Sequence, residues 1–238
     1  MSREISEDFK NLISFFNNYS ISKIVADVDY VTVISKVHKR YFVYLTVVGE
    51  ITLLSKDTSL FPNIGESQND YLKESASDIG NAIFSLINGS YKSANLMLRS
   101  SIETFLKGFN LDVYSDITTE KSLYKIFDTV KTLQFYQNEP QKQLFNLIHQ
   151  KYIDLCAETH TASALNMAHI TSMNYFPRFD KAKAVVISDT ITQLINWYSS
   201  LIVLKYNQHF HKMHFKNKTN ISSILSGNIK RIIQGIDQ

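Results

Sequence analysis

The stretch GNAIFSLINGSYKSANLMLRSSIETFLKGFN, residues 80–110, decides the fold that this sequence predicts. Apolar residues recur at helical spacing on both sides of the tripeptide NGS at 88–90. Because glycine adopts the left-handed conformation that closes a helix, we expect one helix over 70–87 and a second over 91–109. Two long helices joined by so short a link should lie antiparallel. The stretch therefore predicts a helical hairpin.

The composition extends this prediction to the whole chain. The 238 residues include only seven glycines and three prolines, and 44% of them are hydrophobic. Since glycine and proline mark turns, their scarcity favours long helices over a β-sandwich. We therefore expect an all-α bundle of long antiparallel helices, with additional helices at both ends of the chain. Further helices are predicted over 4–18, most of 22–54, 118–135, 138–160, 180–210 and 219–235, with a loop over 56–69.

We expect one domain rather than two, because 238 residues suit a single large core. Within it, residues 1–60 are predicted to form an N-terminal helical extension, residues 70–210 the core, and residues 211–238 a C-terminal helix.

Charge and cysteine content narrow the functional classes. The formal charge of +3 and the pI near 8.7 are too small a basic bias to indicate nucleic acid by themselves. A single cysteine, Cys156, excludes an internal disulfide and fits a reducing compartment. The N-terminus carries charges where a secretory signal needs an apolar core, and no apolar stretch reaches the length of a membrane span. We therefore expect a cytoplasmic protein with no membrane contact.

Several familiar motifs are missing from the sequence. It has no phosphate-binding glycine loop, no Rossmann fingerprint, no Gly-x-Ser-x-Gly elbow and no His-Glu-x-x-His zinc motif. We therefore expect no cofactor, and the familiar routes of nucleotide hydrolysis are disfavoured.

A polar row lies along the second helix of the predicted hairpin. Asn95, Arg99, Glu103 and Lys107 recur every four residues, at the border of the apolar face. Two interpretations stay open. Arg99 and Glu103 form a pair within the helix, worth about 0.2–0.5 kcal/mol, or they form the floor of a site in which partial desolvation strengthens their electrostatics.

The stretch HQKYIDLCAETH, residues 149–160, brings a cysteine and a histidine close to the end of a predicted helix. Cys156 and His160 are four residues apart, and a histidine at a helix C-terminus is suited to proton transfer near neutral pH. Two arrangements are compatible with this spacing. One is a thiolate–imidazolium pair, and the other is an inert buried cysteine beside a capping histidine.

A cluster of histidines, lysines and phenylalanines occupies residues 209–218, HFHKMHFKNK. His209, His211 and His214 lie close in sequence, but no carboxylate or cysteine accompanies them, so we predict no metal site. Interleaved basic and aromatic residues also bind single-stranded nucleic acid. The remaining interpretation is a solvated helix end.

Taken together, the 80–110 stretch and KYIDLCAETH some fifty residues later resemble the HEPN superfamily of helical domains. The similarity is greatest to divergent members in which a Leu-Arg-x-x-x-Glu helix precedes a Tyr-x-x-Leu-x-x-x-x-His helix. It covers roughly residues 70–160 and, in a general way, the long helix expected after residue 180. Many HEPN proteins are metal-independent ribonucleases of toxin–antitoxin, abortive-infection and CRISPR systems, and they often act as dimers.

The resemblance implies a ribonuclease site assembled between two helices. Arg99 and Glu103 come from one helix and His160 from the other, while Asn95, Lys107, Tyr152 and the three histidines of 209–218 are expected to contact RNA. The sequence departs from the family in one respect. None of its five arginines precedes a histidine at the usual spacing of four to six intervening residues.

The sequence thus leaves three functions open. The first is a HEPN-like ribonuclease, a homodimeric toxin-type effector of prokaryotic antiviral defence whose partner is RNA. The second is a catalytically inactive HEPN-like module of a multi-component defence system, which binds a protein partner, such as an antitoxin, or a nucleotide. The third is an RNA-binding protein that uses residues 209–218 and does not cleave.

Overall fold

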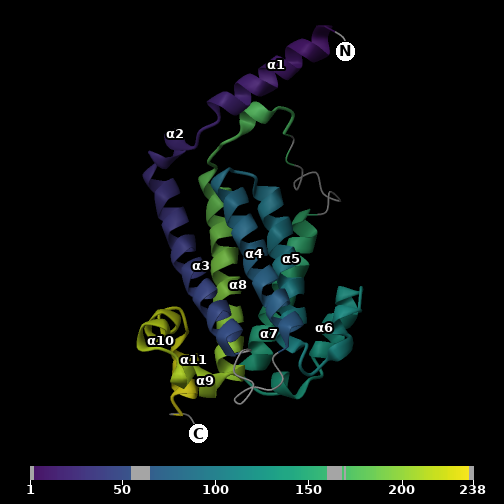
Figure 1. Ribbon diagram of the computed structural model, residues 1–238, viewed down its shortest axis with the longest axis vertical. Helices are drawn as coiled ribbons and strands as arrows, with labels where there is room; N and C mark the ends of the chain where they lie inside the picture. Colours follow the sequence, from purple (N-terminus) through teal and green to yellow (C-terminus); the bar gives the residue numbers. More distant parts are fainter. Residues whose placement is uncertain (1–2, 55–64, 160–167, 169, 236–238) are drawn as a thin grey trace.

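The computed structural model describes residues 3–54, 65–159, 168 and 170–235, and every regular element in these ranges is a helix. The predicted all-α bundle is therefore confirmed (Figure 1). None of the described helices combines the length and the apolar character needed to cross a membrane.

Long helices form the body of the bundle, and shorter ones extend from both ends (Figure 1). The long helices are α3 (Val28–Leu54), α4 (Glu66–Ile87), α5 (Tyr91–Asn110), α7 (Gln141–Thr159) and α8 (Lys181–Lys205). The shorter ones are α1 (Arg3–Asn18), α2 (Ser22–Val25), α6 (Leu123–Val130), α9 (Asn207–Lys212), α10 (Phe215–Ser222) and α11 (Gly227–Ile233), with 3-10 turns η1 (Ser115–Thr118), η2 (Gln134–Tyr136) and η4 (Met173–Tyr175).

The predicted hairpin is the pair α4 and α5, which lie side by side. Gly89 has φ of 75°, and its N–H donates to the Leu86 carbonyl at 3.0 Å. The N–H of Ser90 donates to the Ser85 carbonyl at 2.8 Å, which completes a Schellman closure of α4. Further along, a Cβ atom on Gly108 would lie 2.9 Å from the backbone nitrogen of Leu72, so this glycine lets the two helices approach closely.

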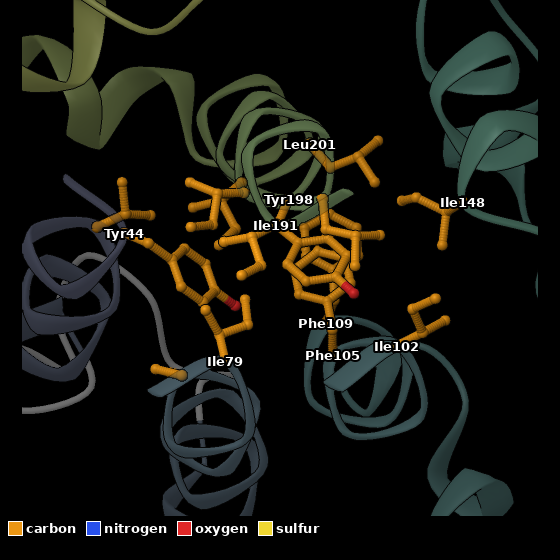
Figure 2. Packing of buried hydrophobic residues seen from close by; sticks show 14 of the residues in the cluster. Tyr44, Ile79, Ile102, Phe105, Phe109, Ile148, Ile191, Tyr198 and Leu201 are labelled. Atoms are coloured by element: carbon orange, nitrogen blue, oxygen red, sulfur yellow. The ribbon is translucent and has the colours of Figure 1, made fainter. Parts of the chain in front are cut away.

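Aromatic rings from three helices meet at the centre of the core (Figure 2). The ring of Tyr198 on α8 stacks on Phe105 of α5, with centroids 3.9 Å apart and an angle of 11° between the planes. The ring centre of Tyr44, on α3, lies 5.8 Å from the ring centre of Tyr198. Ile79 of α4 and Ile148 of α7 complete the cluster, and both are fully buried. The core thus joins all five long helices.

The N-terminal segment divides into two parts with different roles. Val37, Val47 and Ile51 of α3 are fully buried in the core, so α3 is a member of the bundle. Helix α1 instead projects beyond the bundle, and its apolar residues Phe9 and Phe16 are more than half exposed (Figure 1).

Several predicted helix boundaries are wrong. Residues 118–135 form η1, α6 and η2 instead of one helix, because the hydroxyl of Ser122 accepts the N–H of Lys125 and starts α6 there. Residues 219–235 divide into α10 and α11, where Ser226 caps the second helix in the same way. The long helix expected over 180–210 ends at Lys205. Residues 66–69, expected in a loop, form the first turn of α4.

The closure of α4 leads to a stability prediction with a matched control. We expect Gly89→Ala to lower the free energy of unfolding by about 2 kcal/mol, because a Cβ atom is disfavoured at positive φ and would overlap the Arg178 carbonyl oxygen. Gly49→Ala, inside α3 with open space around it, should instead raise stability by up to about 1 kcal/mol. Urea unfolding of both variants measures this. Equal effects would contradict the assigned closure.

Candidate functional site

Arg99 lies at the contact between α5 and α7, which we call the α5–α7 seam. Its Nη2 donates to the hydroxyl of Tyr152 at 3.2 Å, and its guanidinium carbon lies 5.5 Å from the centre of the Tyr152 ring. The hydrogen bond with Tyr152 raises the pKa of Arg99 above its ordinary value, and the nearby Cys156 contributes in the same direction. Arg99 is therefore a permanent cation that is held in place by α7.

The other residues of the polar row pair with different partners. Asn95 donates through Nδ2 to Oε2 of Glu158 at 2.7 Å, which is a second polar link across the seam. Nζ of Lys107 lies 3.0 Å from Oε1 of Glu103. Among the described residues, Glu103 forms no hydrogen bond or ion pair with Arg99, so it orients Lys107 instead. The interpretation that pairs Arg99 with Glu103 within the helix is therefore wrong. The pair within α5 is Glu103 with Lys107.

His160, the expected proton-transfer residue, lies outside the described residues. Helix α7 ends at Thr159, the residue directly before it. The convergence of Arg99 and His160 stays a prediction.

A cavity of about 390 Å³, which we call the Glu158 cavity, lies at the end of the seam where α5 and α8 begin and α7 ends. Asn95 and Glu158 line it, so the second polar link belongs to its wall. Lys92, Arg178 and Lys183 also line it. Three cationic side chains and one carboxylate thus share the cavity wall, and this excess of positive charge suits an anionic group.

The pKa of the Glu158 carboxyl departs from its ordinary value, although the residue is exposed. Partial desolvation raises its pKa above the ordinary value, and Asp154 acts in the same direction, while Lys151 opposes the shift. A carboxyl with a raised pKa exchanges protons closer to neutral pH, as general acids and bases require.

Local structure positions the cations of the Glu158 cavity. The Nε of Arg178 donates to the Gly89 carbonyl at 3.2 Å, and its guanidinium carbon lies 5.5 Å from the ring centre of Tyr91. Asp180 caps α8 by accepting the N–H of Lys183 at 3.2 Å, as its position in the sequence suggests. The turn after α4 and the first turn of α8 therefore hold this end of the site together.

The four charged residues of this cavity were not predicted as site residues from the sequence: Lys92, Glu158, Arg178 and Lys183. They come from three separate segments, and no spacing pattern connects them. Only Glu158 had a signal, since it lies one helical turn from Asp154 near the end of the stretch that carries His160. Of the described residues expected in the site, Asn95 lines the cavity. Four others do not: Arg99, Glu103, Lys107 and Tyr152.

The histidines of 209–218 have separate structural partners. His209 Nε2 lies 3.3 Å from a carboxylate oxygen of Glu50, and His211 Nε2 lies 2.8 Å from the Ile233 carbonyl oxygen. Nδ1 of His214 accepts the N–H of Lys216 at 3.3 Å and so caps α10. Within the part of the chain that the structure describes, no three His, Cys, Asp or Glu side chains gather as metal ligands do. The cluster links the C-terminal helices to each other and to α3.

Comparisons of this chain with protein-family models, with curated proteins and with solved structures find no match. The function proposed below rests on the geometry of the Glu158 cavity and on the resemblance of the sequence to the HEPN superfamily.

Two partly buried imidazoles generate a prediction about pH. Burial lowers the pKa of His209 and of His149 below the ordinary value of 6.5. As the pH falls below that value, the unfolded chain binds protons at these sites before the folded protein does, so acidification removes stability.

We therefore expect His209→Gln and His149→Gln each to reduce the loss of unfolding free energy between about pH 7.5 and about pH 5.5, and the double variant to reduce it further. Urea unfolding at the two pH values measures this. His38→Gln, which removes an exposed imidazole from α3, is the matched control. If the double variant loses as much stability as the unmodified protein, the assignment of these two histidines is wrong.

Proposed function

We propose that this chain is a HEPN-like, metal-independent ribonuclease that binds RNA at the Glu158 cavity. The observation that carries the proposal is a cavity wall that holds Lys92, Arg178 and Lys183 together with Glu158, a carboxyl of raised pKa, next to the seam that holds Arg99. The resemblance to HEPN toxins leads us to propose a role as a homodimeric effector in prokaryotic antiviral defence. Both the family and the activity are inferences from the sequence and the geometry.

Substrate binding in this proposal depends on charge and on hydrogen bonding. The backbone of RNA carries one negative charge per nucleotide, and the three cations of the cavity neutralise adjacent phosphates. Asn95 lies in the cavity wall and offers its amide to the ribose or to a base edge. Helices hold most of these groups, so the site is largely formed before RNA arrives.

Cleavage would proceed by internal attack within the RNA. The 2′-oxygen attacks the adjacent phosphorus and loses its proton to a base, while the bond from phosphorus to the 5′-oxygen breaks and that oxygen gains a proton. The products are a 2′,3′-cyclic phosphate and a 5′-hydroxyl. Glu158 and His160 are the proposed proton-transfer pair, and Arg99 stabilises the charge on the phosphorane oxygens.

The alternative is a catalytically inactive HEPN-like module that binds a protein partner. One observation favours it. The Arg99 guanidinium already has a partner in Tyr152, and its Nε is closed to solvent, so its charge has a structural use without any substrate. The exposed apolar residues of α1 are consistent with a protein partner at that end of the molecule.

The two functions predict different results with labelled single-stranded RNA in the presence of EDTA. The ribonuclease should produce fragments that end in 2′,3′-cyclic phosphate. Arg99→Ala, His160→Ala and Glu158→Gln should each slow this cleavage by about 100-fold or more. Lys92→Ala and Lys183→Ala should each weaken binding and reduce the slope of log affinity against log salt by roughly 0.7.

Lys125→Ala is the matched control, since it removes an exposed cation from α6, away from the cavity. It should leave cleavage and its salt dependence unchanged. Circular dichroism of each variant checks that the fold persists. If the unmodified protein binds RNA without cutting it, the ribonuclease is excluded and an RNA-binding role remains. If it neither binds nor cuts, the inactive module is favoured.

A further inference from the structure

The C-terminal helices α9, α10 and α11 carry ionic charge of one sign only. Residues 207–235 contain no Asp or Glu, and their five cations are Lys212, Lys216, Lys218, Lys230 and Arg231. Because the whole chain has a formal charge of +3, the other residues together carry −2. Positive charge is thus concentrated in one short segment of a nearly balanced chain. Such an asymmetry is typical of proteins that bind a polyanion.

A groove lies within these helices, and we call it the C-terminal groove. It has a volume of about 650 Å³ and extends between α9, α10 and α11. Among the described residues that line it, Lys218 and Lys230 carry positive charge and none is a carboxylate. Nζ of Lys218 donates to the His211 carbonyl at 3.1 Å, which leaves two N–H donors on the ammonium. Neither lysine forms an ion pair with a residue that the structure describes, so both charges are available to a ligand.

An exposed aromatic ring lines the same groove. Phe215, the first residue of α10, is 76% exposed, and it is the only exposed large hydrophobic residue within 207–235. A helix that binds a membrane surface needs a row of such residues, so one ring does not suit insertion into a bilayer. A single exposed ring beside cations instead suits the stacking of a base, as in proteins that bind single-stranded nucleic acid.

Two hydroxyl groups of the groove favour RNA over DNA. Oγ1 of Thr219 donates to the Phe215 carbonyl at 3.0 Å, and Oγ of Ser223 donates to the Asn220 carbonyl at 2.7 Å. Both residues are exposed and line the groove. Because each hydroxyl hydrogen is already used, each oxygen is left as an acceptor. A phosphate oxygen cannot donate to it, whereas the 2′-hydroxyl of ribose can.

We propose that the C-terminal groove binds single-stranded RNA. Lys218 and Lys230 neutralise two phosphates, a base stacks on Phe215, and the oxygens of Thr219 and Ser223 accept hydrogen bonds from ribose. An acidic protein fits this surface less well, since lysine is depleted where two protein surfaces bury each other.

The C-terminal groove and the Glu158 cavity lie at opposite ends of α8 (Figure 1). Lys183, in the first turn of α8, lines the Glu158 cavity, while α9 begins at Asn207, just after α8 ends. The 25 residues of α8 span about 37 Å at about 1.5 Å per residue. A long RNA strand can therefore contact both sites, whereas a dinucleotide occupies only one. The groove adds affinity for long RNA and takes no part in cleavage, so it does not require the proposed ribonuclease activity.

Fluorescence anisotropy with labelled oligouridylate, about ten nucleotides long, tests the groove. The parent protein carries Glu158→Gln and Lys183→Ala, which suppress cleavage and weaken binding at the Glu158 cavity. In this parent, Lys218→Ala with Lys230→Ala should weaken binding by at least about tenfold. The pair should also reduce the slope of log affinity against log salt by roughly 1.4, for two phosphates at about 0.7 each. Phe215→Ala should weaken binding by about fivefold or more without changing the slope, because stacking releases no counterions.

The chain offers a matched control for each substitution. Phe84→Ala removes a similarly exposed ring from α4, and Lys125→Ala removes an exposed cation from α6. Neither residue lines the groove, so both variants should bind as the parent does. Oligodeoxyuridylate of the same length should bind more weakly than the RNA because it lacks the 2′-hydroxyl. Duplex RNA should also bind more weakly, since its bases are already stacked on each other. Circular dichroism checks that each variant keeps its fold.

Four results would overturn the proposal. The first is unchanged affinity and salt slope when both lysines are replaced. The second is equal affinity of the Phe215→Ala and Phe84→Ala variants. The third is binding of the DNA or of the duplex as tightly as the single-stranded RNA. The fourth is capture of the protein by phosphatidylglycerol vesicles but not by oligouridylate, which would assign the groove to a membrane surface.

A dinucleotide substrate separates this proposal from the ribonuclease. Replacing Lys218 and Lys230 in the otherwise unmodified protein should leave dinucleotide cleavage unchanged, because the groove is too far from the Glu158 cavity to contact so short a substrate. If no RNA is cleaved but the lysine substitutions weaken binding of the long strand, the groove is supported and the ribonuclease is excluded. If the dinucleotide is cleaved but the substitutions leave binding of the long strand unchanged, the groove proposal is wrong and the ribonuclease stands.

Discussion

The stack of Tyr198 on Phe105 is the contact on which the arrangement of the helices depends. Tyr198 is fully buried, and its hydroxyl lies 3.3 Å from Oγ of Ser101 on α5. A buried hydroxyl is costly without a partner, so this pair favours one rotation and one axial position of α8 against α5. Because α8 is held in this way, its first turn meets the first turn of α5, and Lys92 and Lys183 reach the same cavity. The site at the end of the bundle is thus a consequence of packing at its centre.

The parts of the fold that sequence predicts well are those with local signals. The closure at Gly89 is such a signal, since only the few residues around it decide the conformation, and the hairpin follows. The breaks at Ser122 and Ser226 were missed because serine also occurs inside helices, and only the surrounding structure decides whether its hydroxyl caps a new one. Apolar periodicity continues across both breaks, so the pattern alone favours one long helix.

The candidate site also has one part that local sequence signals predict and another part that they do not. The position of the polar row at the border of the core was readable from its spacing, and Arg99 and Asn95 do contact α7. Their partners were not readable, because they depend on the rotation of α7 about its own axis. The position of Arg178 was still harder to predict from the sequence. It depends on the path of the chain before α8 and on the hydrogen bond from Arg178 to the Gly89 carbonyl. The role of His160 stays a prediction from the family resemblance.

Helix α8 contributes residues to two cavities of the molecule. The packing of the α8 segment between them decides whether binding in one cavity affects the other. Ile187 lines the Glu158 cavity, and Asn196 lines a second cavity, of about 450 Å³, between α8 and α11. Asn196 lies about 13.5 Å further along the helix axis, at about 1.5 Å per residue. Ile191 and Leu194, between these two positions, are fully buried in the core. A close-packed segment resists gradual displacement, so occupation of one cavity shifts the other only if α8 has a second packed position of similar free energy. The stack of Tyr198 on Phe105 opposes such a position, because sliding or rotating α8 would separate the rings and leave the Tyr198 hydroxyl without Ser101. The same contact that assembles the first site therefore favours its independence from the second.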